Sequence, residues 1–337
     1  MGWDVMEWHV PIATFAIGLA GTWLARRYAL HCGLVDEPGE RRSHASTTPR
    51  GGGISIVIAM LAVVAWLAWR EPGQGVVLAA IGGGLALVAG IGWADDHRSL
   101  SPGLRLLVHA MAAALLAWAV LALGAGTATA VLAFVVALVL VNVWNFIDGI
   151  DGLAASQAMI AALGFGLLAG GGWVATLGVA LAAACAGFLP LNLPFKQRRA
   201  SIFLGDVGSG ALGYLLAVLV ALLLAGSSWR QAPLLLLPLV ACGIDAALTL
   251  ARRVLRGERW WQPHVQHAYQ RWARRSGHAR VAFAFLAWTM VEVAFMLLAD
   301  GRSPIVIMCV VGISCLAACA VWLRVQQSRE SPAGEGQ

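Results

Sequence analysis

Long apolar stretches recur along almost the whole of this 337-residue chain. We count eleven, each of roughly 17 to 25 residues, the length that an α-helix needs to cross a hydrocarbon core about 30 Å thick. Helices are expected rather than barrel strands, because lipid offers backbone groups no partners and no alternation of apolar and polar residues is visible. The sequence thus predicts an all-α integral membrane protein, a polytopic bundle of about 11 transmembrane helices at approximately 7–25, 53–69, 76–93, 104–122, 129–147, 153–170, 173–190, 209–226, 233–251, 281–299 and 304–323.

The composition excludes a soluble domain. Hydrophobic residues make up 60% of the chain, charged residues only 12%, and the mean hydropathy is +0.77, so the polar surface is too small to cover the protein in water. Nothing divides the chain, and we expect a single transmembrane domain over 1–325 with a disordered cytoplasmic tail over 326–337. The six cysteines form no C-x-x-C pair, which predicts neither a disulfide framework nor a zinc site.

Basic residues are distributed unequally between the two ends of the spans. When the eleven spans are threaded alternately through a bilayer, 20 of the 23 Lys and Arg residues fall on one side. Only Arg70, Arg230 and Arg302 fall on the other. Because cytoplasmic loops carry the excess of Lys and Arg in membrane proteins, the N-terminus is predicted outside and the C-terminus in the cytoplasm.

Acidic residues gather at the predicted cytoplasmic face, although they come from three separate parts of the sequence. They follow the third span in "GWADDHRSLSP", follow the fifth in "NVWNFIDGIDGL" and precede the eighth in "FKQRRASIFLGDVGSG". A carboxylate at membrane depth costs about 2.5 to 3.5 kcal/mol on insertion scales, so a group of them needs a compensating cation. The group consists of Asp95, Asp96, Asp148, Asp151 and Asp206.

The segment after the fifth span carries polar residues at three-residue intervals. Asn142, Asn145, Asp148 and Asp151 would lie along one broad helix face, and Gly149 follows within the same segment. Packing gains nothing from such a stripe, whereas hard oxygen ligands suit Mg²⁺ or Mn²⁺, which also accept phosphate oxygens and water. For each acid taken alone, a helix cap or a solvated boundary residue stays the simpler interpretation.

Two basic loops on the same side supply partners for anions. The first, "LVDEPGERRSHASTTPRGGG", lies between the first two spans, and the second, over 252–280, carries eight Arg and three His. The positive-inside bias explains part of this, most of all for Arg252, Arg253, Arg274 and Arg275. Arg and His close to a divalent metal are the components of phosphoryl transfer. His264 and His267 lack the intervening Glu of a zinc protease motif, which makes that class improbable.

Six motifs occur together between residues 36 and 271: "DEPGERRSHASTTPRGGG", "WADD", "NVWNFIDGIDGLA", "FLGDVGSGALG", "IDAALTLARR" and "HVQHAYQR". Their combination and order resemble the polyprenyl-phosphate N-acetylhexosamine-1-phosphate transferases (glycosyltransferase family 4), which include phospho-N-acetylmuramoyl-pentapeptide translocase. The last motif departs from the consecutive histidines of the translocase branch. It is more similar to the branch of undecaprenyl-phosphate N-acetylglucosaminyl-1-phosphate transferases that initiate O-antigen, and the identity of the sugar stays open.

The resemblance implies an enzyme that transfers an N-acetylated amino-sugar 1-phosphate from a UDP-sugar to undecaprenyl phosphate. The products would be undecaprenyl-pyrophosphoryl-sugar and UMP, in the first membrane-bound step of O-antigen or related cell-envelope glycan synthesis. It implies the bacterial inner (cytoplasmic) membrane, with the active site facing the cytoplasm and no nucleic-acid partner. The expected cofactor is Mg²⁺, with Mn²⁺ as the alternative, and a homodimer is left open.

The resemblance also implies roles for individual residues. Asp206 and Asn145 would hold the metal, and Asp95 and Asp96 would place or deprotonate the acceptor phosphate. Asp148 and Asp151 would shape the nucleotide pocket. The expected substrate-binding residues are Arg41, Arg42, His44, Arg50, Asn142, Gly149, His264, His267 and Arg271.

The competing class is a transporter or a flippase for a lipid-linked sugar. Such a protein would carry polar residues near the bilayer midplane, on broken helices in two related halves. Here the candidates at depth are only His109, Asp245 and Glu292, and the sequence shows no internal symmetry. The transferase is therefore the favoured interpretation.

Overall fold

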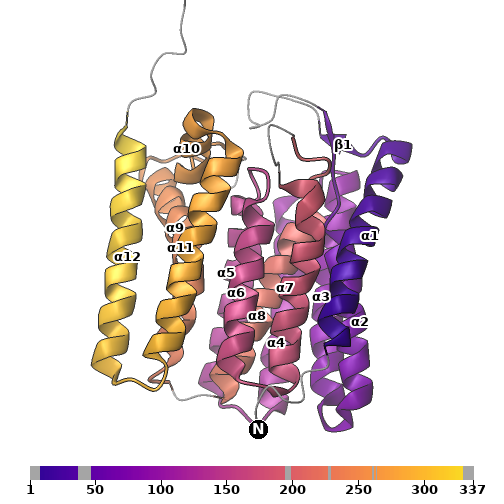
Figure 1. Ribbon diagram of the computed structural model, residues 1–337, viewed down its shortest axis with the longest axis vertical. Helices are drawn as coiled ribbons and strands as arrows, with labels where there is room; N and C mark the ends of the chain where they lie inside the picture. Colours follow the sequence, from indigo (N-terminus) through magenta and orange to yellow (C-terminus); the bar gives the residue numbers. More distant parts are fainter. Residues whose placement is uncertain are drawn as a thin grey trace, which may run out of the picture.

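The computed structural model describes residues 8–36, 47–193, 199–226, 229–259, 262 and 264–328. This part of the chain is mostly helical, which confirms the predicted all-α class (Figure 1). Its α-helices are α1 (His9–Cys32), α2 (Ile54–Arg70), α3 (Gly75–His97), α4 (Pro102–Ala122), α5 (Thr127–Ile147), α6 (Leu153–Ala169), α7 (Gly172–Asn192), α8 (Asp206–Gly226), α9 (Val240–Leu255), α10 (Ala268–Ser276), α11 (His278–Ala299) and α12 (Pro304–Gln327). Two 3₁₀ helices, η2 (Pro72–Gln74) and η3 (Ala232–Leu239), and two short strands, β1 (Val35–Asp36) and β2 (Thr48–Pro49), complete it.

Each of the eleven predicted stretches coincides with a helix, the ninth with η3 and α9 together. Eight helical segments of the described chain are long and apolar enough to cross a membrane: η2 with α3, then α4, α5, α7, α8, η3 with α9, α11 and α12. The apolar helices α2 and α6 are shorter, at 17 residues each. The protein is thus an integral membrane protein, while the count of eleven spans and their sidedness stay predictions.

Helix α8 forms the centre of the bundle. It packs against α3, α5 and α6, and against α2, α4 and α7 as well. In its most apolar window 94% of the residues are buried, as expected for a helix that is hydrophobic on every side. Small residues permit this packing, since a Cβ atom on Gly213 of α8 would overlap the backbone of Leu140 in α5.

One end of the bundle collects the helix termini that carry the predicted site. At this end, uppermost in Figure 1, α3, α5 and α9 finish and α4, α6, α8 and α10 begin. The segment before α8 pairs with the segment before α2: the Phe203 amide donates to the Pro49 carbonyl at 2.8 Å, and the Gly53 amide donates to the Leu204 carbonyl at 2.8 Å. A Cβ on Gly53 would overlap Gly208, so only glycine lets these two helices start so close together.

Two polar side chains inside the bundle, Glu292 and Gln157, accept hydrogen bonds from other helices. Glu292 of α11 accepts hydrogen bonds from Nε1 of Trp288 and from the hydroxyl of Ser314 in α12, both at 2.8 Å. Gln157 of α6 accepts one from the hydroxyl of Thr289. These contacts tie α11 to α12 and to α6. Glu292 is thus buried and hydrogen-bonded between two helices, as expected for a residue that holds the bundle together.

Two predicted boundaries differ from the structure. Residues 252–280 were expected to form a loop, yet residues up to Leu255 belong to α9 and Ala268–Ser276 form α10. Helix α10 is short and rich in Arg, so the apolar-span criterion did not detect it. Helix α12 continues to Gln327, so residues 326 and 327 of the predicted tail are helical, and residues from 329 onward lie outside the described chain.

The charge distribution and the bundle together predict which ends are accessible from outside the cell. In a variant without the natural cysteines, a single cysteine at Gly73 or Ser303 should react with an impermeant maleimide in intact cells. One at Gln262 should react only after the cells are permeabilised, because it lies at the arginine-rich end. All three positions are exposed in the structure, so burial does not confuse the comparison. Labelling of Gln262 from outside would overturn the predicted orientation.

Candidate active site

The buried carboxylate of Asp96 fixes where α8 begins. Asp96 lies at the end of α3 and is 2% exposed. Its Oδ1 accepts the Asp206 amide at 3.0 Å and its Oδ2 accepts the Val207 amide at 3.1 Å. The first amides of a helix have no partner within the helix, and a negative charge there also meets the positive end of the helix dipole. Arg50 approaches from before α2 and donates to the Asp96 carbonyl.

A chain of polar contacts joins the ends of α3 and α5 to the starts of α4 and α8. Nη1 of Arg105, in the first turn of α4, donates to Oδ2 of Asp95 at 2.6 Å and to Oδ2 of Asp206 at 3.1 Å. Nδ2 of Asn145 donates to the other oxygen of Asp206 at 2.9 Å. The Leu100 amide donates to Oδ1 of Asp95 at 2.6 Å. The structure therefore brings together Asp95, Asp96, Asn145 and Asp206 as predicted, with Arg105 between the carboxylates.

Arg105 is a residue of the site that the sequence motifs did not indicate. It was counted only among the cytoplasmic basic residues, and it is the second residue of the span predicted at 104–122. At the end of a span a long basic side chain reaches the interface at little cost, so its position alone carried no signal. The acidic "DD" ten residues earlier was the signal that could have indicated a partner.

The other two acids of the group have different surroundings. Asp148 follows α5, is half-buried, and forms no hydrogen bond or ion pair with the described residues. Burial, and then the neighbouring charges of Asp206, Asp96 and Asp151, raise the pKa of Asp148 well above its usual range. Asp151 lies 3.4 Å from Nδ1 of His278, at the start of α11. Asp148 is thus the carboxylate of this group that has no partner among the residues that the structure describes.

Asn142, a member of the predicted stripe, and Gly149, an expected substrate-binding residue, both contact other parts of the protein. Nδ2 of Asn142 donates to the Leu138 carbonyl of its own helix at 2.7 Å, so its amide is engaged within α5. Gly149 lies against α10, where a Cβ would overlap the Tyr269 hydroxyl. The glycine is needed for the fit between two parts of the site. Arg41, Arg42 and His44 lie outside the described residues.

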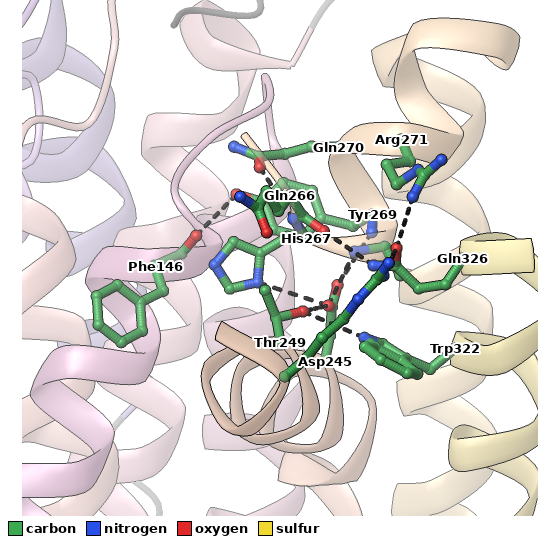
Figure 2. A network of polar contacts seen from close by, with 12 residues as sticks. Phe146, Asp245, Thr249, Gln266, His267, Tyr269, Gln270, Arg271, Trp322 and Gln326 are labelled. Atoms are coloured by element: carbon green, nitrogen blue, oxygen red, sulfur yellow. Dashed lines mark hydrogen bonds and ion pairs between the residues drawn. The ribbon is translucent and has the colours of Figure 1, made fainter. Parts of the chain in front are cut away.

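Helix α10 is held by a second buried carboxylate, that of Asp245 in α9 (Figure 2). The Ala268 amide donates to its Oδ1 at 2.9 Å and the Tyr269 amide donates to its Oδ2 at 3.0 Å. The Thr249 hydroxyl donates to Oδ1 of Asp245 at 3.1 Å. The arrangement repeats that of Asp96 and α8: an acid on one helix supplies the missing acceptors at the start of another.

Tyr269 connects helix α10 to the segment that carries Asp148. Its hydroxyl donates to the Phe146 carbonyl at 2.7 Å, two residues before Asp148 (Figure 2). His267 precedes α10, and its ring stacks on that of His264 with 4.9 Å between the centroids. Burial, and then the neighbouring charges of His267 and Arg253, lower the pKa of His264 to about 4. His264 is therefore an uncharged imidazole at pH 7.

The arginines of this region act mainly on the protein itself. Nη1 of Arg271 donates to Oε1 of Gln326 in α12 at 2.8 Å, so this nitrogen is engaged between α10 and α12 (Figure 2). Arg253 was ascribed to the positive-inside bias, but it is 4% exposed. It donates to Glu258 at 2.9 Å and to the carbonyls of Arg259 and Gln262 at 3.0 Å. Arg253 thus fixes the loop that leads to His264.

A divalent cation fits the acidic group in chemistry. Asp206 and Asp95 both direct carboxylate oxygens at the Arg105 guanidinium. The amide oxygen of Asn145 has no hydrogen bond with the described residues, so it is available as a third oxygen ligand. Among the described residues, no three Asp, Glu, His or Cys side chains converge to hold a metal by themselves. Mg²⁺ needs no such cluster, because it is commonly bound through one or two carboxylates together with substrate phosphates and water.

Similarity to known proteins agrees with this geometry. Residues 78–224 match the family model described as glycosyl transferase family 4. The chain is 32% identical over 333 residues to decaprenyl-phosphate N-acetylglucosaminephosphotransferase of Mycobacterium tuberculosis, covering 85% of this chain and 80% of the relative. It is 28% identical over 292 residues to undecaprenyl-phosphate alpha-N-acetylglucosaminyl 1-phosphate transferase of Yersinia pestis, covering 82% and 79%.

The chain belongs to glycosyl transferase family 4, among the polyprenyl-phosphate N-acetylglucosamine-1-phosphate transferases. This confirms the resemblance carried by the six sequence motifs. The matched residues 78–224 contain Asp95, Asp96, Asn145 and Asp206, so the acidic group lies inside the family region. The transporter alternative loses its support for two reasons. The acidic group lies at one end of the bundle, and the chain belongs to a transferase family.

The capping of α10 predicts the effect of Asp245→Asn. An amide has one oxygen in place of two acceptors, so one backbone amide of α10 would lose its partner, at a cost of about 1 to 3 kcal/mol. Hydrogen exchange of residues 264–276, followed by mass spectrometry, should become about tenfold faster or more. The control is Asp300→Asn, at an exposed position at the opposite end of the bundle. Unchanged exchange of α10 in Asp245→Asn would contradict the capping role.

Proposed function

We propose that this protein transfers an N-acetylated amino-sugar 1-phosphate from a UDP-sugar to undecaprenyl phosphate or a related polyprenyl phosphate, with release of UMP. The observation that carries the proposal is the meeting of the acidic group with the histidines before α10 at one end of an apolar bundle. A lipid acceptor arrives through the bilayer and a nucleotide sugar through water, so the reaction must occur at such an end. Initiation of O-antigen or a related envelope glycan, in the bacterial inner membrane, is the proposed context.

Asp206 and Asn145 are the residues proposed to hold Mg²⁺, or Mn²⁺ in its place. When bound, the cation would offset the negative charge of the two phosphate-bearing substrates and stabilise charge developing at the transferred phosphorus. Asp96 supports this role indirectly, because its two hydrogen bonds set the position of Asp206 at the start of α8. Arg50, on the other side of Asp96, adds a fixed positive charge close to the site.

Asp148 is proposed as the base that receives the last proton of the acceptor phosphate. Asp95 and Asp96, the first candidates for that role, already accept hydrogen bonds from Arg105, Leu100 and the start of α8. Asp148 has no such partner among the described residues. Its raised pKa suits a base better than the usual value does, because a base of very low pKa has little affinity for the proton.

The histidines before α10 are proposed to bind the nucleotide sugar. His264 and His267 lie stacked beside the segment that carries Asp148, and they are linked to it by the bond from Tyr269 to Phe146. Nδ1 of His264 accepts the Gln266 amide at 3.3 Å, so the Nε2–H of the neutral imidazole is left to donate a hydrogen bond to a sugar or a uracil. Gly149 contributes by leaving room for Tyr269.

The proposed activity is tested with purified protein, undecaprenyl phosphate, Mg²⁺ and a panel of UDP-sugars, with release of UMP as the measurement. UDP-N-acetylated amino sugars should support turnover and UDP-glucose should not. Asp206→Asn should insert and purify normally while turnover falls by several orders of magnitude, because a charged ligand is lost at nearly constant volume. Glu71→Gln, at an exposed position at the other end, is the control. Near-normal turnover of Asp206→Asn would refute the ligand role.

The role of Asp148 predicts a pH dependence. A base works only when it is deprotonated, so activity should fall as the pH drops through a pKa well above the usual value of about 3.9. In Asp148→Asn, the residual kcat should lose this acid limb. In Asp151→Asn the limb should persist but move to lower pH, because the charge of Asp151 is one of the causes that raise the pKa of Asp148. An Asp148→Asn variant with the parent kcat and the parent acid limb would exclude Asp148 as the base.

A further inference from the structure

The guanidinium of Arg105 occupies the position between two carboxylates where a cation would be expected. One nitrogen of Arg105 contacts both Asp95, at 2.6 Å, and Asp206, at 3.1 Å. Two carboxylates this close repel each other, and the arginine stays protonated at all physiological pH values. The protein thus carries its own positive charge at its acidic group.

We infer that Arg105 is an exchangeable counter-cation: its guanidinium holds Asp95 and Asp206 in the absence of metal, and a divalent cation must displace it from Asp206 to bind. The inference rests on the proposed metal role of Asp206. It adds that the affinity for metal is set by competition with a residue of the chain itself, and that Arg105 is a positioning residue rather than a ligand.

The geometry favours exchange over a permanent ion pair. The Asp206 side chain is 35% exposed and that of Arg105 is 31% exposed, so water and ions reach both partners. Asp95, by contrast, is 10% exposed and is also held by the Leu100 amide. Arg105 can therefore release Asp206 while it keeps Asp95, and Asp206 stays in place because its backbone amide is bound to Asp96.

The exchange has a consequence for the substrate. A divalent cation and a guanidinium repel each other when both lie against one carboxylate. Once Arg105 has left Asp206, its remaining donors are available at the same end of the bundle for an anion. Phosphate oxygens are strong acceptors for a guanidinium. Metal and phosphate would therefore be taken up together, while the metal-free site stays electrically compensated.

The inference is tested by the binding of Mn²⁺ alone to purified protein, with free Mn²⁺ measured by electron paramagnetic resonance. Arg105→Gln removes the competitor and should tighten Mn²⁺ binding by about tenfold, within the usual range of coupling between two sites. Arg105→Lys keeps the positive charge on a shorter, more strongly hydrated side chain, so it should bind Mn²⁺ with an affinity between those of Arg105→Gln and the parent. Arg98→Gln removes a positive charge from an exposed position three residues after Asp95 and should bind as the parent does.

Weaker or unchanged Mn²⁺ binding in Arg105→Gln would overturn the inference, since a residue that merely organises the ligands weakens metal binding when it is lost. If Arg105→Gln does not accumulate, Arg105→Lys decides by the same criterion. The Mg²⁺ requirement of UMP release separates this outcome from failure of the metal site itself. If UMP release by the parent needs Mg²⁺ but the variants bind Mn²⁺ with unchanged affinity, only the role of Arg105 is refuted. If the parent releases UMP without any divalent cation, both the metal site and the role of Arg105 are refuted.

Discussion

The two hydrogen bonds from the start of α8 to the buried carboxylate of Asp96 are the interaction on which the site depends. Helix α8 is the most buried helix of the bundle, and a helix start buried without acceptors would leave its first amides unsatisfied. Asp96 supplies both acceptors, and by doing so it fixes the end of α3 against the start of α8. The position of Asp206, and hence of Asn145 and Arg105 around it, follows from this contact.

Asp245 serves α10 in the same way, so both parts of the site are set by an acid on one helix and the start of another. Tyr269 and Gly149 then join the two parts, through the bond to the Phe146 carbonyl and through close packing. In both places the carboxylate and the backbone amides at the helix start satisfy each other within the protein. The histidines are held by fixed helix ends and not by a loop alone.

The five aspartates at this face are alike in sequence, yet the fold gives them different chemistry. Asp96 caps a helix, Asp95 and Asp206 share Arg105, Asp151 lies beside His278, and Asp148 has no partner among the described residues. Burial, and then the charges of the neighbouring carboxylates, raise the pKa of Asp148 well above its usual range. One cluster thus divides into structural acids, a cation site and a base.

The sequence by itself determined the helical membrane class, the position of every long helix and the gathering of five acids at one end, because apolar length and charge are properties of the chain that need no fold. It also determined the family, through six motifs. Only the tertiary structure decided that Arg105 lies between the acids, that Asp245 caps α10, that α10 is a helix at all, and that Arg271 and Asn142 point to partners other than the acidic group. Those facts depend on distances between helices that are far apart in the chain, and spacing within one helix carries no information about them.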